Sequence, residues 1–207
     1  NVEYAAIYNK HLYPYADAIA ASYIDENGNG HTENATVLTG SETSLNGGTY
    51  TVIGTVDFDQ DVSFSGDTKL IIPDASRFYV SGRNIIVTGN LSVYGQEHRI
   101  GEFYVNDITA TGDIILSNIY ADGSSITSGA GRNILIAGGE QYYYQLNYRN
   151  ETGTVTLGYV DAENDEIYAQ YYNCQVKIRD GQKLVQEYDY TKIYSGTLTD
   201  AQRAEIE

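Results

Sequence analysis

The chain has 207 residues, of which 42% are hydrophobic, and its 28 acidic and 12 basic residues give it a formal net charge of −16. This hydrophobic share is typical of a folded domain and excludes wholesale disorder, while the acidic excess repels phosphate backbones and anionic lipids. We therefore expect no nucleic-acid partner and, because no apolar stretch approaches the roughly 20 residues of a membrane-spanning helix, no membrane insertion. The single cysteine, Cys174, excludes an intrachain disulfide.

The first predicted element is an amphipathic helix over residues 9–24. Its apolar residues recur at spacings of three and four, and Pro14 falls where a first helical turn tolerates proline. These apolar residues are Leu12, Tyr15, Ala16, Ile19, Ala20 and Tyr23. An apolar helix face ahead of a repeat domain is typical of an end cap, so we interpret residues 1–49 as a helix and a hairpin that cap the domain.

The turn of this predicted hairpin is the segment DENGNG, which starts at Asp25. Its residues match the first half of the calcium-loop pattern D-x-[DN]-x-[DN]-G, but Thr36 stands at the twelfth position, where that loop needs a glutamate. Asn and Gly tolerate the positive φ angles of tight turns. A β-hairpin turn is therefore favoured over a calcium site.

Residues 50–138 repeat a short phrase in which a few apolar residues are closed by Gly, Asp or Asn, as in VSFSGD, KLIIPD, RFYVSG and NIIVTG. The strands are too close together for helices between them, and corresponding strands recur about every 20 to 23 residues. This rhythm predicts an all-β fold, a parallel β-helix (β-solenoid) with three short strands in each coil. The expected stacked pairs are Val62 with Ile85, Leu70 with Leu91, Leu91 with Ile114, and Ile114 with Ile134.

The first coil carries three carboxylates at alternate positions, Asp57, Asp59 and Asp61. Alternation points Phe58 inward and places the three carboxylates on one strand face, with a bend or bulge expected at Gln60. A solvated face that discourages edge pairing is the favoured interpretation. Two others remain open: a Ca²⁺ site, or the acid and base of a polysaccharide-cleaving enzyme.

After Gly139 the sequence changes to longer strands rich in tyrosine. We interpret residues 139–207 as strands that complete the solenoid and end in a short helix, because Thr199 and Gln202 have the spacing of a capping box. Tyrosine combines a flat apolar ring with a polar hydroxyl, which suits it to stacking on sugars and to protein interfaces, although such rings also form cores. The candidate ligand-binding residues are Tyr142, Tyr144, Tyr148, Tyr171 and Tyr172.

An acidic loop in this last third contains Asp161 and Asp165. Together with the three aspartates of the first coil, these residues are the candidate ligands for Ca²⁺, which is the one cofactor that the sequence suggests. Acidic loops are usually only hydrated, so the favoured expectation is that the protein has no cofactor.

Two stretches carry a family resemblance. One covers residues 23–53, YIDENGNGHTENATVLTGSETSLNGGTYTVI, and continues into FSGDTKLIIPDASRFYVSGRNIIVTGNLSVYGQ; the other covers residues 154–199. They resemble a module of large secreted surface proteins of gut and oral bacteria of the Bacteroidales type. The resemblance implies a β-solenoid in an adhesin-like protein, outside the cell or on the bacterial surface, with no catalytic residues to transfer. Since the chain starts at Asn1 and contains no Met, we expect it to be part of a longer protein.

These observations predict a non-catalytic extracellular module. It acts as a stalk or adhesive element and binds a glycan, or a host or bacterial surface protein, through exposed tyrosines. One alternative is a polysaccharide lyase or glycosidase on a β-helix that uses Asp57, Asp59 or Asp61. The other is a filament subunit that self-associates through the open ends of its coils.

Overall fold

The computed structural model describes residues 4–8, 11–14, 18–148, 153–157, 166–171, 174–177, 182–187 and 190–195, with side chains from 18 to 141 other than Ser81. Within these residues the fold is all-β and contains no helix. The strands are β1 (Tyr4–Tyr8), β2 (His11–Pro14), β3 (Ala18–Ile24), β4 (Gly30–Val37), β5 (Ser44–Thr51), β6 (Thr55–Asp57), β7 (Val62–Ile71), β8 (Arg77–Val87), β9 (Leu91–Tyr94), β10 (Glu102–Ala110), β11 (Ile114–Ser128), β12 (Asn133–Tyr148), β13 (Gly153–Leu157), β14 (Glu166–Tyr171), β15 (Cys174–Lys177), β16 (Gln182–Glu187) and β17 (Tyr190–Ser195).

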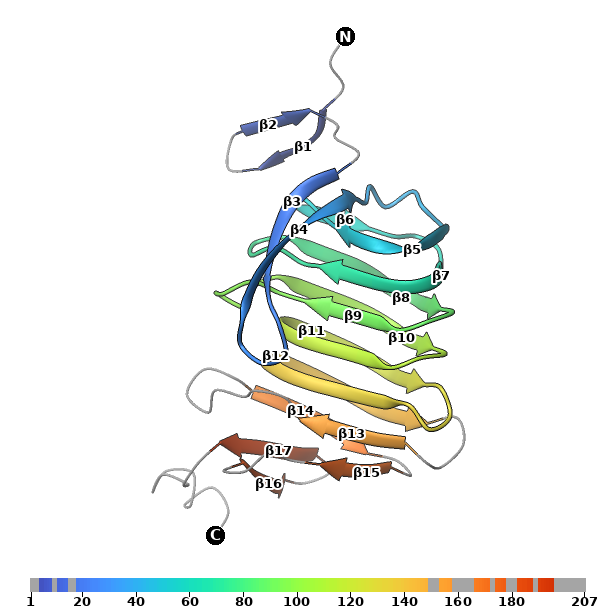
Figure 1. The fold of residues 1–207 in the computed structure, drawn as a ribbon, viewed down its shortest axis with the longest axis vertical. Coiled ribbons are helices and arrows are strands. Elements are labelled where there is room, and N and C mark those ends of the chain that lie inside the picture. Colours follow the sequence, from blue (N-terminus) through green and yellow to red (C-terminus); the bar gives the residue numbers. More distant parts are fainter. Residues whose placement is uncertain are drawn as a thin grey trace.

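The strands wind into a solenoid of about five turns, in which each turn stacks in parallel on the next (Figure 1). Each turn has three faces. Face A contains β6 and the first parts of β8 and β10, face B contains the last parts of β8 and β10, and face C contains β9 and the last parts of β5 and β7. The long strands β11 and β12 bend through all three faces. The predicted parallel β-solenoid is therefore confirmed.

The predicted stacking of the coils is confirmed at three of its four pairs. The confirmed pairs are Val62↔Ile85, Leu91↔Ile114 and Ile114↔Ile134. At the fourth pair, Leu70 lies opposite Val93, while Leu91 lies opposite Thr68. A slip of two residues leaves the same side chains inside, so alternation alone does not determine this pairing.

Apolar side chains that alternate with exposed ones fill the interior of the solenoid. Phe58, Phe78 and Phe103 stack in successive turns, with ring centroids 4.9 and 5.5 Å apart, and none is more than 2% exposed. Burying a side chain of this size stabilises a fold by about 1.5–3 kcal/mol. The interior column of phenylalanines is therefore a major source of stability.

The expected bend at Gln60 is confirmed, because the chain between β6 and β7 is not a strand.

A ladder of Asp and Asn side chains holds the corner between faces B and C. The Oδ1 atom of Asp67 accepts a hydrogen bond from the backbone N–H of Asn90 at 2.8 Å. In the same way Asn90 accepts from Asp113, and Asp113 accepts from Asn133, each at 2.8 Å. Each bond joins one turn to the next where the chain changes direction, which explains why Asp and Asn close the repeated phrase.

A β-hairpin crosses the outside of face C. Strands β3 and β4 pair in antiparallel fashion over residues 18–37, and we call this hairpin the strap. Figure 1 shows that the strap crosses several coils, running roughly along the axis of the solenoid. Ala21, Tyr23 and Ala35 of the strap pack on outward-facing Ile71 and Tyr94, and all five are buried. The molecule therefore has a second, smaller core outside the solenoid.

The helix predicted over residues 9–24 is wrong for the described part of that segment. His11–Pro14 forms β2, which pairs with β1, and Ala18–Ile24 forms β3. The alternate residues Ala21 and Tyr23 are only 4% and 5% exposed, because face C covers them. The segment fits both periodicities, and burial against face C selects the strand.

Asp25 holds the turn of the strap. Its Oδ1 atom accepts hydrogen bonds from the backbone N–H of Asn27 at 2.9 Å and of Asn29 at 2.8 Å. Its Oδ2 atom lies 2.9 Å from Nε2 of His31, and Gly28 has a φ of 86°. The predicted hairpin turn is therefore confirmed, and the carboxylate that a calcium loop would use is hydrogen-bonded within the turn.

A loop closes the N-terminal end of the solenoid, where a capping helix is predicted. Leu38 is 2% exposed and belongs to the interior core. Gly40 has a φ of 92°, and a Cβ there would stand 2.6 Å from the carbonyl oxygen of Asp57, so only glycine fits. The carboxylate of Glu42 accepts hydrogen bonds from the backbone N–H of Thr39 at 3.0 Å and of Gly40 at 2.9 Å. This loop thus covers the first turn.

Parallel stacking continues past residue 138 through β12, β13, β14 and β15, and the antiparallel pair β16–β17 follows. The helix predicted from Thr199 lies outside the described residues. In the described part of the chain, no helix has the length and apolarity needed to cross a membrane.

Candidate functional site

Three tyrosines form a ladder on the outer surface of face A. Tyr79 lies opposite Tyr104 on the neighbouring strand, and Tyr120 follows on β11. The ring centroids of Tyr79 and Tyr104 are 4.9 Å apart, and those of Tyr104 and Tyr120 are 5.8 Å apart. All three side chains are partly exposed. We call this row the tyrosine ladder.

Strand alternation fixes the outward direction of the ladder. In β8, Phe78 and Val80 on either side of Tyr79 are fully buried. The same Phe-Tyr-Val triplet recurs in β10 around Tyr104. Because successive side chains of a strand point to opposite faces, two inward anchors force the tyrosine between them outward. The ladder is therefore held on a rigid sheet.

Carboxylates border the tyrosine ladder. Glu102 lies opposite Tyr120 in the strand register and forms an ion pair with Arg77, with 2.9 Å between Oε1 and Nη2. Asp122 lies opposite Tyr104. Burial raises the pKa of Tyr104, and the neighbouring Tyr120 and Glu102 raise it further. The hydroxyl of Tyr104 therefore stays protonated at neutral pH and can donate a hydrogen bond.

This arrangement offers three kinds of contact on one surface. The partly exposed tyrosine rings are apolar, tyrosine hydroxyls donate and accept hydrogen bonds, and the carboxylates of Glu102 and Asp122 are acceptors. A sugar ring has a matching apolar face and a rim of hydroxyls. The ladder is thus chemically suited to a neutral glycan lying across successive turns.

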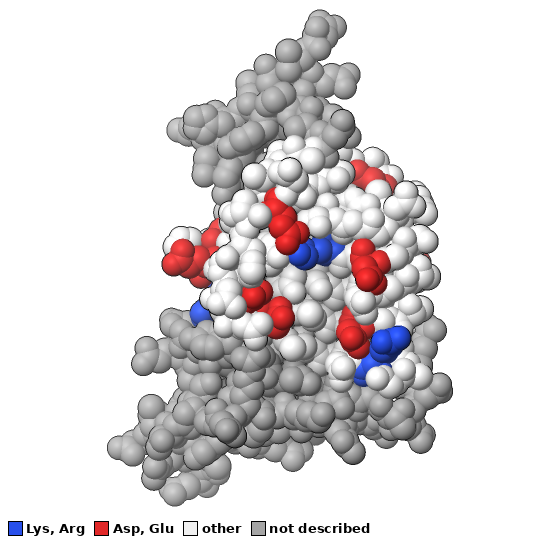
Figure 2. Space-filling view, in the orientation of Figure 1, with Lys and Arg blue, Asp and Glu red and all other residues white. Residues whose placement is uncertain are grey.

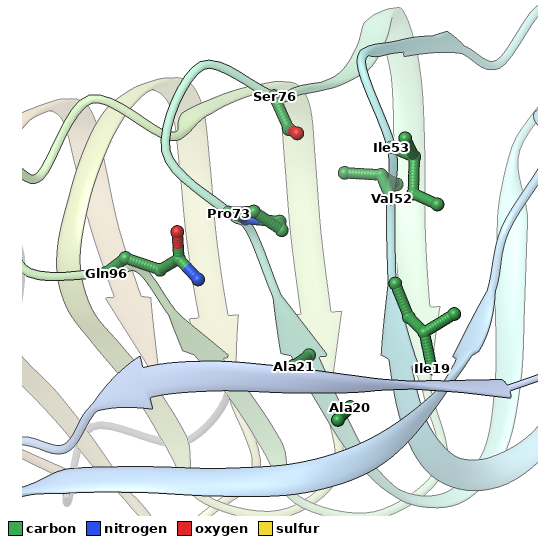
Figure 3. Close-up of a pocket in the computed structure, with 8 residues that line it drawn as sticks. All are labelled: Ile19, Ala20, Ala21, Val52, Ile53, Pro73, Ser76 and Gln96. Carbon is green, nitrogen blue, oxygen red and sulfur yellow. The ribbon is translucent and has the colours of Figure 1, made fainter. Parts of the chain in front are cut away.

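A small apolar pocket lies between β3 and the corner that joins faces C and A (Figure 3). Its volume is about 270 Å³. Figure 3 shows Ile19 and Ile53 on one side of the pocket and Gln96 on the other. We call it the edge pocket, and its lining residues are Ile19, Ala20, Ala21, Val52, Ile53, Pro73, Ser76 and Gln96.

A second, more polar cleft of about 420 Å³ lies beside the strap turn and includes both His31 and His98. The ring of His31 stacks on Tyr23 with centroids 5.1 Å apart. The carboxylate of Asp74 accepts hydrogen bonds from the backbone N–H of His98 at 3.2 Å and of Ile100 at 3.3 Å. These contacts order the loop and the strap turn, so the cleft is first of all a structural junction.

Lys69 ties the strap to face C. Its Nζ donates hydrogen bonds to Oε1 of Glu33 at 2.6 Å and to the hydroxyl of Tyr23 at 2.8 Å. It also lies 4.8 Å from the centroid of the Tyr23 ring. The hydrogen bonds from Lys69 and Tyr23 lower the pKa of Glu33. This network fixes the position of β3 and hence one wall of the edge pocket.

The sequence predicts that the three aspartates of the first coil share one strand face, and this prediction is wrong. Only Asp57 lies on β6, while Asp59 and Asp61 lie in the corner before β7. Oδ1 of Asp61 accepts a hydrogen bond from the backbone N–H of Asn84 at 2.9 Å, and the carbonyl of Asp59 accepts from Nε of Arg83 at 2.9 Å. The chain bends after Asp57, which breaks the expected row. Among the described residues, no three His, Cys, Asp or Glu side chains are grouped to hold a metal ion.

The tyrosines predicted to bind a ligand lie beyond the described side chains. Tyr142, Tyr144 and Tyr148 are on β12 and Tyr171 is on β14, whereas Tyr172, Asp161 and Asp165 lie outside the described residues. In the strand register Tyr142 lies opposite Asp122, which itself lies opposite Tyr104. The register row of Tyr79 and Tyr104 therefore continues through Asp122 to Tyr142, one of the tyrosines that the sequence predicts to bind a ligand.

The sequence-based prediction missed Tyr79, Tyr104 and Tyr120. A signal for two of them is present, because the triplet Phe-Tyr-Val occurs in both RFYVSG and EFYVND. An aromatic residue that repeats at an outward position of a solenoid marks a surface row. Tyr120 sits in a different sequence context, NIYAD, and it reaches the ladder by a diagonal ring contact with Tyr104, because its own register partner is Glu102.

Acidic side chains outnumber basic ones over the described coils. Residues 18–148 contain fifteen Asp and Glu and five Lys and Arg. On the face seen in Figure 2, the acidic side chains are spread over the coils rather than gathered in one patch. Such a surface disfavours anionic ligands and is compatible with neutral or cationic ones.

Comparisons with protein-family models, with curated proteins and with solved structures found no match. The functional argument therefore rests on the geometry of the tyrosine ladder, the strap and the edge pocket.

Proposed function

We propose that this chain is a non-catalytic, extracellular glycan-binding module whose binding surface is the tyrosine ladder on face A. The observation that carries the proposal is the stacking of three partly exposed tyrosines in successive turns of a rigid solenoid. A soluble protein gains little from leaving a row of large rings in contact with water, so such a row is typical of a recognition surface.

The surroundings of the ladder support a neutral sugar chain as the ligand. Glu102 and Asp122 supply acceptors for sugar hydroxyls next to the rings. The acidic surface repels sulfated or uronic-acid polymers, whereas a neutral glycan carries no charge to repel. A glycan running along the solenoid axis would contact several rings at once, which adds their contributions.

The solenoid accounts for the second part of the proposal, a stalk or adhesive element of a bacterial surface protein. Stacked coils form a stiff rod that holds a binding surface away from its attachment point. The resemblance to modules of Bacteroidales-type surface proteins supports this location.

A glycan array probed with the full chain tests the proposal. We expect binding to a set of neutral glycans, and Tyr104→Ala, which removes the middle ring, should weaken that binding by about tenfold. Tyr104→Phe keeps the ring and should retain most of the affinity. Ile86→Ala is the matched control, since Ile86 is an exposed apolar residue, 43% exposed, on the adjacent face B.

Two results would contradict the proposal. An array with no bound glycan removes sugar recognition altogether. Binding that is equally strong in Tyr104→Ala and in the unchanged chain moves recognition away from the ladder. Far-UV circular dichroism of each variant verifies that the fold is retained.

The same samples address the polysaccharide-cleaving alternative. Incubating the chain with each bound glycan and measuring new reducing ends should show none. Reducing ends that appear with the chain and disappear with Asp57→Asn or Asp61→Asn would identify an enzyme and overturn the non-catalytic assignment.

A further inference from the structure

Three asparagines in the described part of the chain are each followed by glycine: Asn27, Asn29 and Asn46. The backbone nitrogen of such a glycine can attack the side-chain amide carbon of the asparagine, because glycine has no side chain to obstruct the approach. The new N–C bond closes a succinimide ring, and the amide nitrogen leaves as ammonia with the proton of the glycine N–H. Water then opens the ring at either carbonyl and gives aspartate or isoaspartate.

The pair at Asn46 lies in a paired strand. Asn46 is opposite Ser65, and its carbonyl accepts a hydrogen bond from the hydroxyl of Tyr50 at 2.7 Å. Gly47 packs on the backbone of the next turn, where a Cβ would stand 2.7 Å from the carbonyl oxygen of Asp67. Ring closure needs the asparagine side chain and the following peptide to turn towards each other, so this strand has to open first.

The first pair of the strap turn, Asn27 with Gly28, is also held in place. The N–H of Gly28 donates a hydrogen bond to the carbonyl of Asp25 at 3.0 Å, and the N–H of Asn27 donates to Oδ1 of Asp25 at 2.9 Å. The nitrogen that would attack is therefore engaged in the hydrogen bond that closes the turn.

The second pair of the strap turn, Asn29 with Gly30, differs from the other two. Both residues are exposed, and Gly30 lies opposite Ile24. The N–H of Asp25 donates to the carbonyl of Asn29 at 2.9 Å, and bonded and non-bonded pairs alternate along an antiparallel ladder, so the next pair is non-bonded. The N–H of Gly30 therefore points to the outer edge of β4, where no described strand pairs before Thr36.

The side-chain amide of Asn29 belongs to the network that holds the turn. Its Nδ2 donates a hydrogen bond to Oδ2 of Asp25 at 3.3 Å, and the same oxygen lies 2.9 Å from Nε2 of His31. Converting the amide into an acid replaces this donor by a second carboxylate, which repels that of Asp25. The isoaspartyl product also lengthens the main chain by one carbon atom just before β4.

The strap turn is coupled to the second core on face C. Beside Asp25, Oε2 of Glu26 accepts a hydrogen bond from the hydroxyl of Tyr94 at 3.0 Å, and the ring of His31 stacks on Tyr23. Tyr23 and Tyr94 are both buried in this core. A weakened turn therefore loosens the cover of face C.

We propose that Asn29 is a self-modification site, at which the backbone nitrogen of Gly30 displaces ammonia and the resulting aspartate or isoaspartate loosens the strap. The reaction uses water as its only other reactant and needs no enzyme. Because ammonia is lost, the change runs in one direction, so the strap is fastened in new protein and loosens with age. The inference does not rest on glycan binding, since the tyrosine ladder lies on face A.

Peptide mapping of the full chain, after incubation at neutral pH in heavy-oxygen water, tests the reaction. Cleavage after glutamate releases residues 27–33, NGNGHTE, and tandem mass spectrometry separates the two asparagines in this peptide. Conversion at Asn29, with uptake of one solvent oxygen, should be at least about tenfold faster than at Asn27 or Asn46, because those sites must open first. Equal rates at the three sites, or no conversion at Asn29, would overturn the proposal.

Gly30→Ala identifies the attacking nitrogen. A Cβ at Gly30 would stand 3.8 Å from Cδ1 of Ile24, which is an ordinary contact, so alanine fits the turn. Its methyl group obstructs the attack, and conversion of Asn29 should slow severalfold. A conversion rate equal to that of the unchanged chain contradicts attack by Gly30.

Hydrogen–deuterium exchange measures the effect on the strap. Converted protein and Asn29→Asp should exchange the amides of Ala21 and Tyr23 at least about tenfold faster than fresh protein, while the amides of β10 stay unchanged. Gly30→Ala, incubated for the same time, is the matched control and should retain slow exchange. Equal exchange in fresh and converted protein would overturn the loosening of the strap. Glycan binding should be the same in both samples, so the two proposals fail separately.

Discussion

Two aromatic columns run side by side through face A, one inside the solenoid and one outside. Phe78 and Phe103 stack within the interior, while their sequence neighbours Tyr79 and Tyr104 stack on the surface. The phenylalanines are 0% exposed and the tyrosines are partly exposed. The same repeated triplet therefore serves two purposes. The inner column stabilises the fold, and the outer column is the surface on which we propose that a glycan binds.

Removing an inner ring should produce the largest effect. Phe103→Ala leaves a cavity between two packed turns and should lower the free energy of unfolding by about 3–5 kcal/mol. Urea denaturation followed by circular dichroism measures the change. A loss below about 1 kcal/mol would show that the inner column does not support the solenoid.

The strap breaks the simple division into inside and outside. Ile71 points out of the solenoid, yet it is 0% exposed because Ala21 and Tyr23 of the strap cover it. Ile71→Ala should therefore cost about 2–5 kcal/mol, as expected for an interior residue. Its control is Ile86→Ala, another outward isoleucine but 43% exposed, which should cost less than about 0.5 kcal/mol. Equal losses in the two variants would mean that the strap contributes no core.

The strap turn also makes stability depend on acid. Desolvation opposes it, but hydrogen bonds from Asn29, His31 and Asn27 lower the pKa of Asp25 to about 2, from an ordinary value of 3.8. A carboxylate whose pKa is lowered by folding contributes stability above its unfolded pKa. That contribution disappears as the pH falls from about 4 to about 2, because the unfolded chain then binds the additional proton.

The urea midpoint measured at several pH values between about 5 and 2 tests this dependence. Asp25→Asn removes the titrating group and should flatten the curve, and part of the slope should remain because the pKa of Glu33 is also lowered. The double variant with Glu33→Gln should be flatter still. A curve that is identical in Asp25→Asn and in the unchanged chain would remove Asp25 from the acid response.

The solenoid can be predicted from sequence because its signal is local. Short apolar runs closed by Gly, Asp or Asn predict the coils, and alternation predicts that Val62 and Phe64 are inside. The predicted partner of Leu70 is wrong by two residues. Alternation determines only which side of the strand a residue faces, and Thr68 and Leu70 both face inward, so it does not decide which of them lies opposite Leu91.

The strap cannot be predicted in the same way, because its strand depends on a distant surface. Residues 18–24 satisfy both the helical and the alternating pattern, and only contact with Ile71 and Tyr94 decides between them. The outward apolar side chain of Ile71 is the signal that something covers face C. The identity of the covering segment follows from tertiary packing alone.

The candidate site is predictable only in part for a related reason. Exposed tyrosines are expected from composition, but the ladder depends on which residues of adjacent turns meet. Tyr79 and Tyr104 are register partners and are 25 residues apart in sequence, whereas Tyr120 is only 16 residues from Tyr104 and meets it diagonally, because the register partner of Tyr120 is Glu102. No single repeat length brings all three together.

Removing an outer ring should lower the free energy of unfolding much less than removing an inner ring, which completes the comparison. Tyr104→Ala should lower the free energy of unfolding by about 1 kcal/mol, because an outward cross-strand aromatic pair contributes only about 0.2–1 kcal/mol. Thermal and urea unfolding of this variant beside Phe103→Ala measure the difference between neighbouring residues of one strand. If Tyr104→Ala destabilises the chain as much as Phe103→Ala, the outer column is a structural ladder. A small loss of stability with a large loss of glycan binding means instead that the outer tyrosine is kept for contact with a ligand.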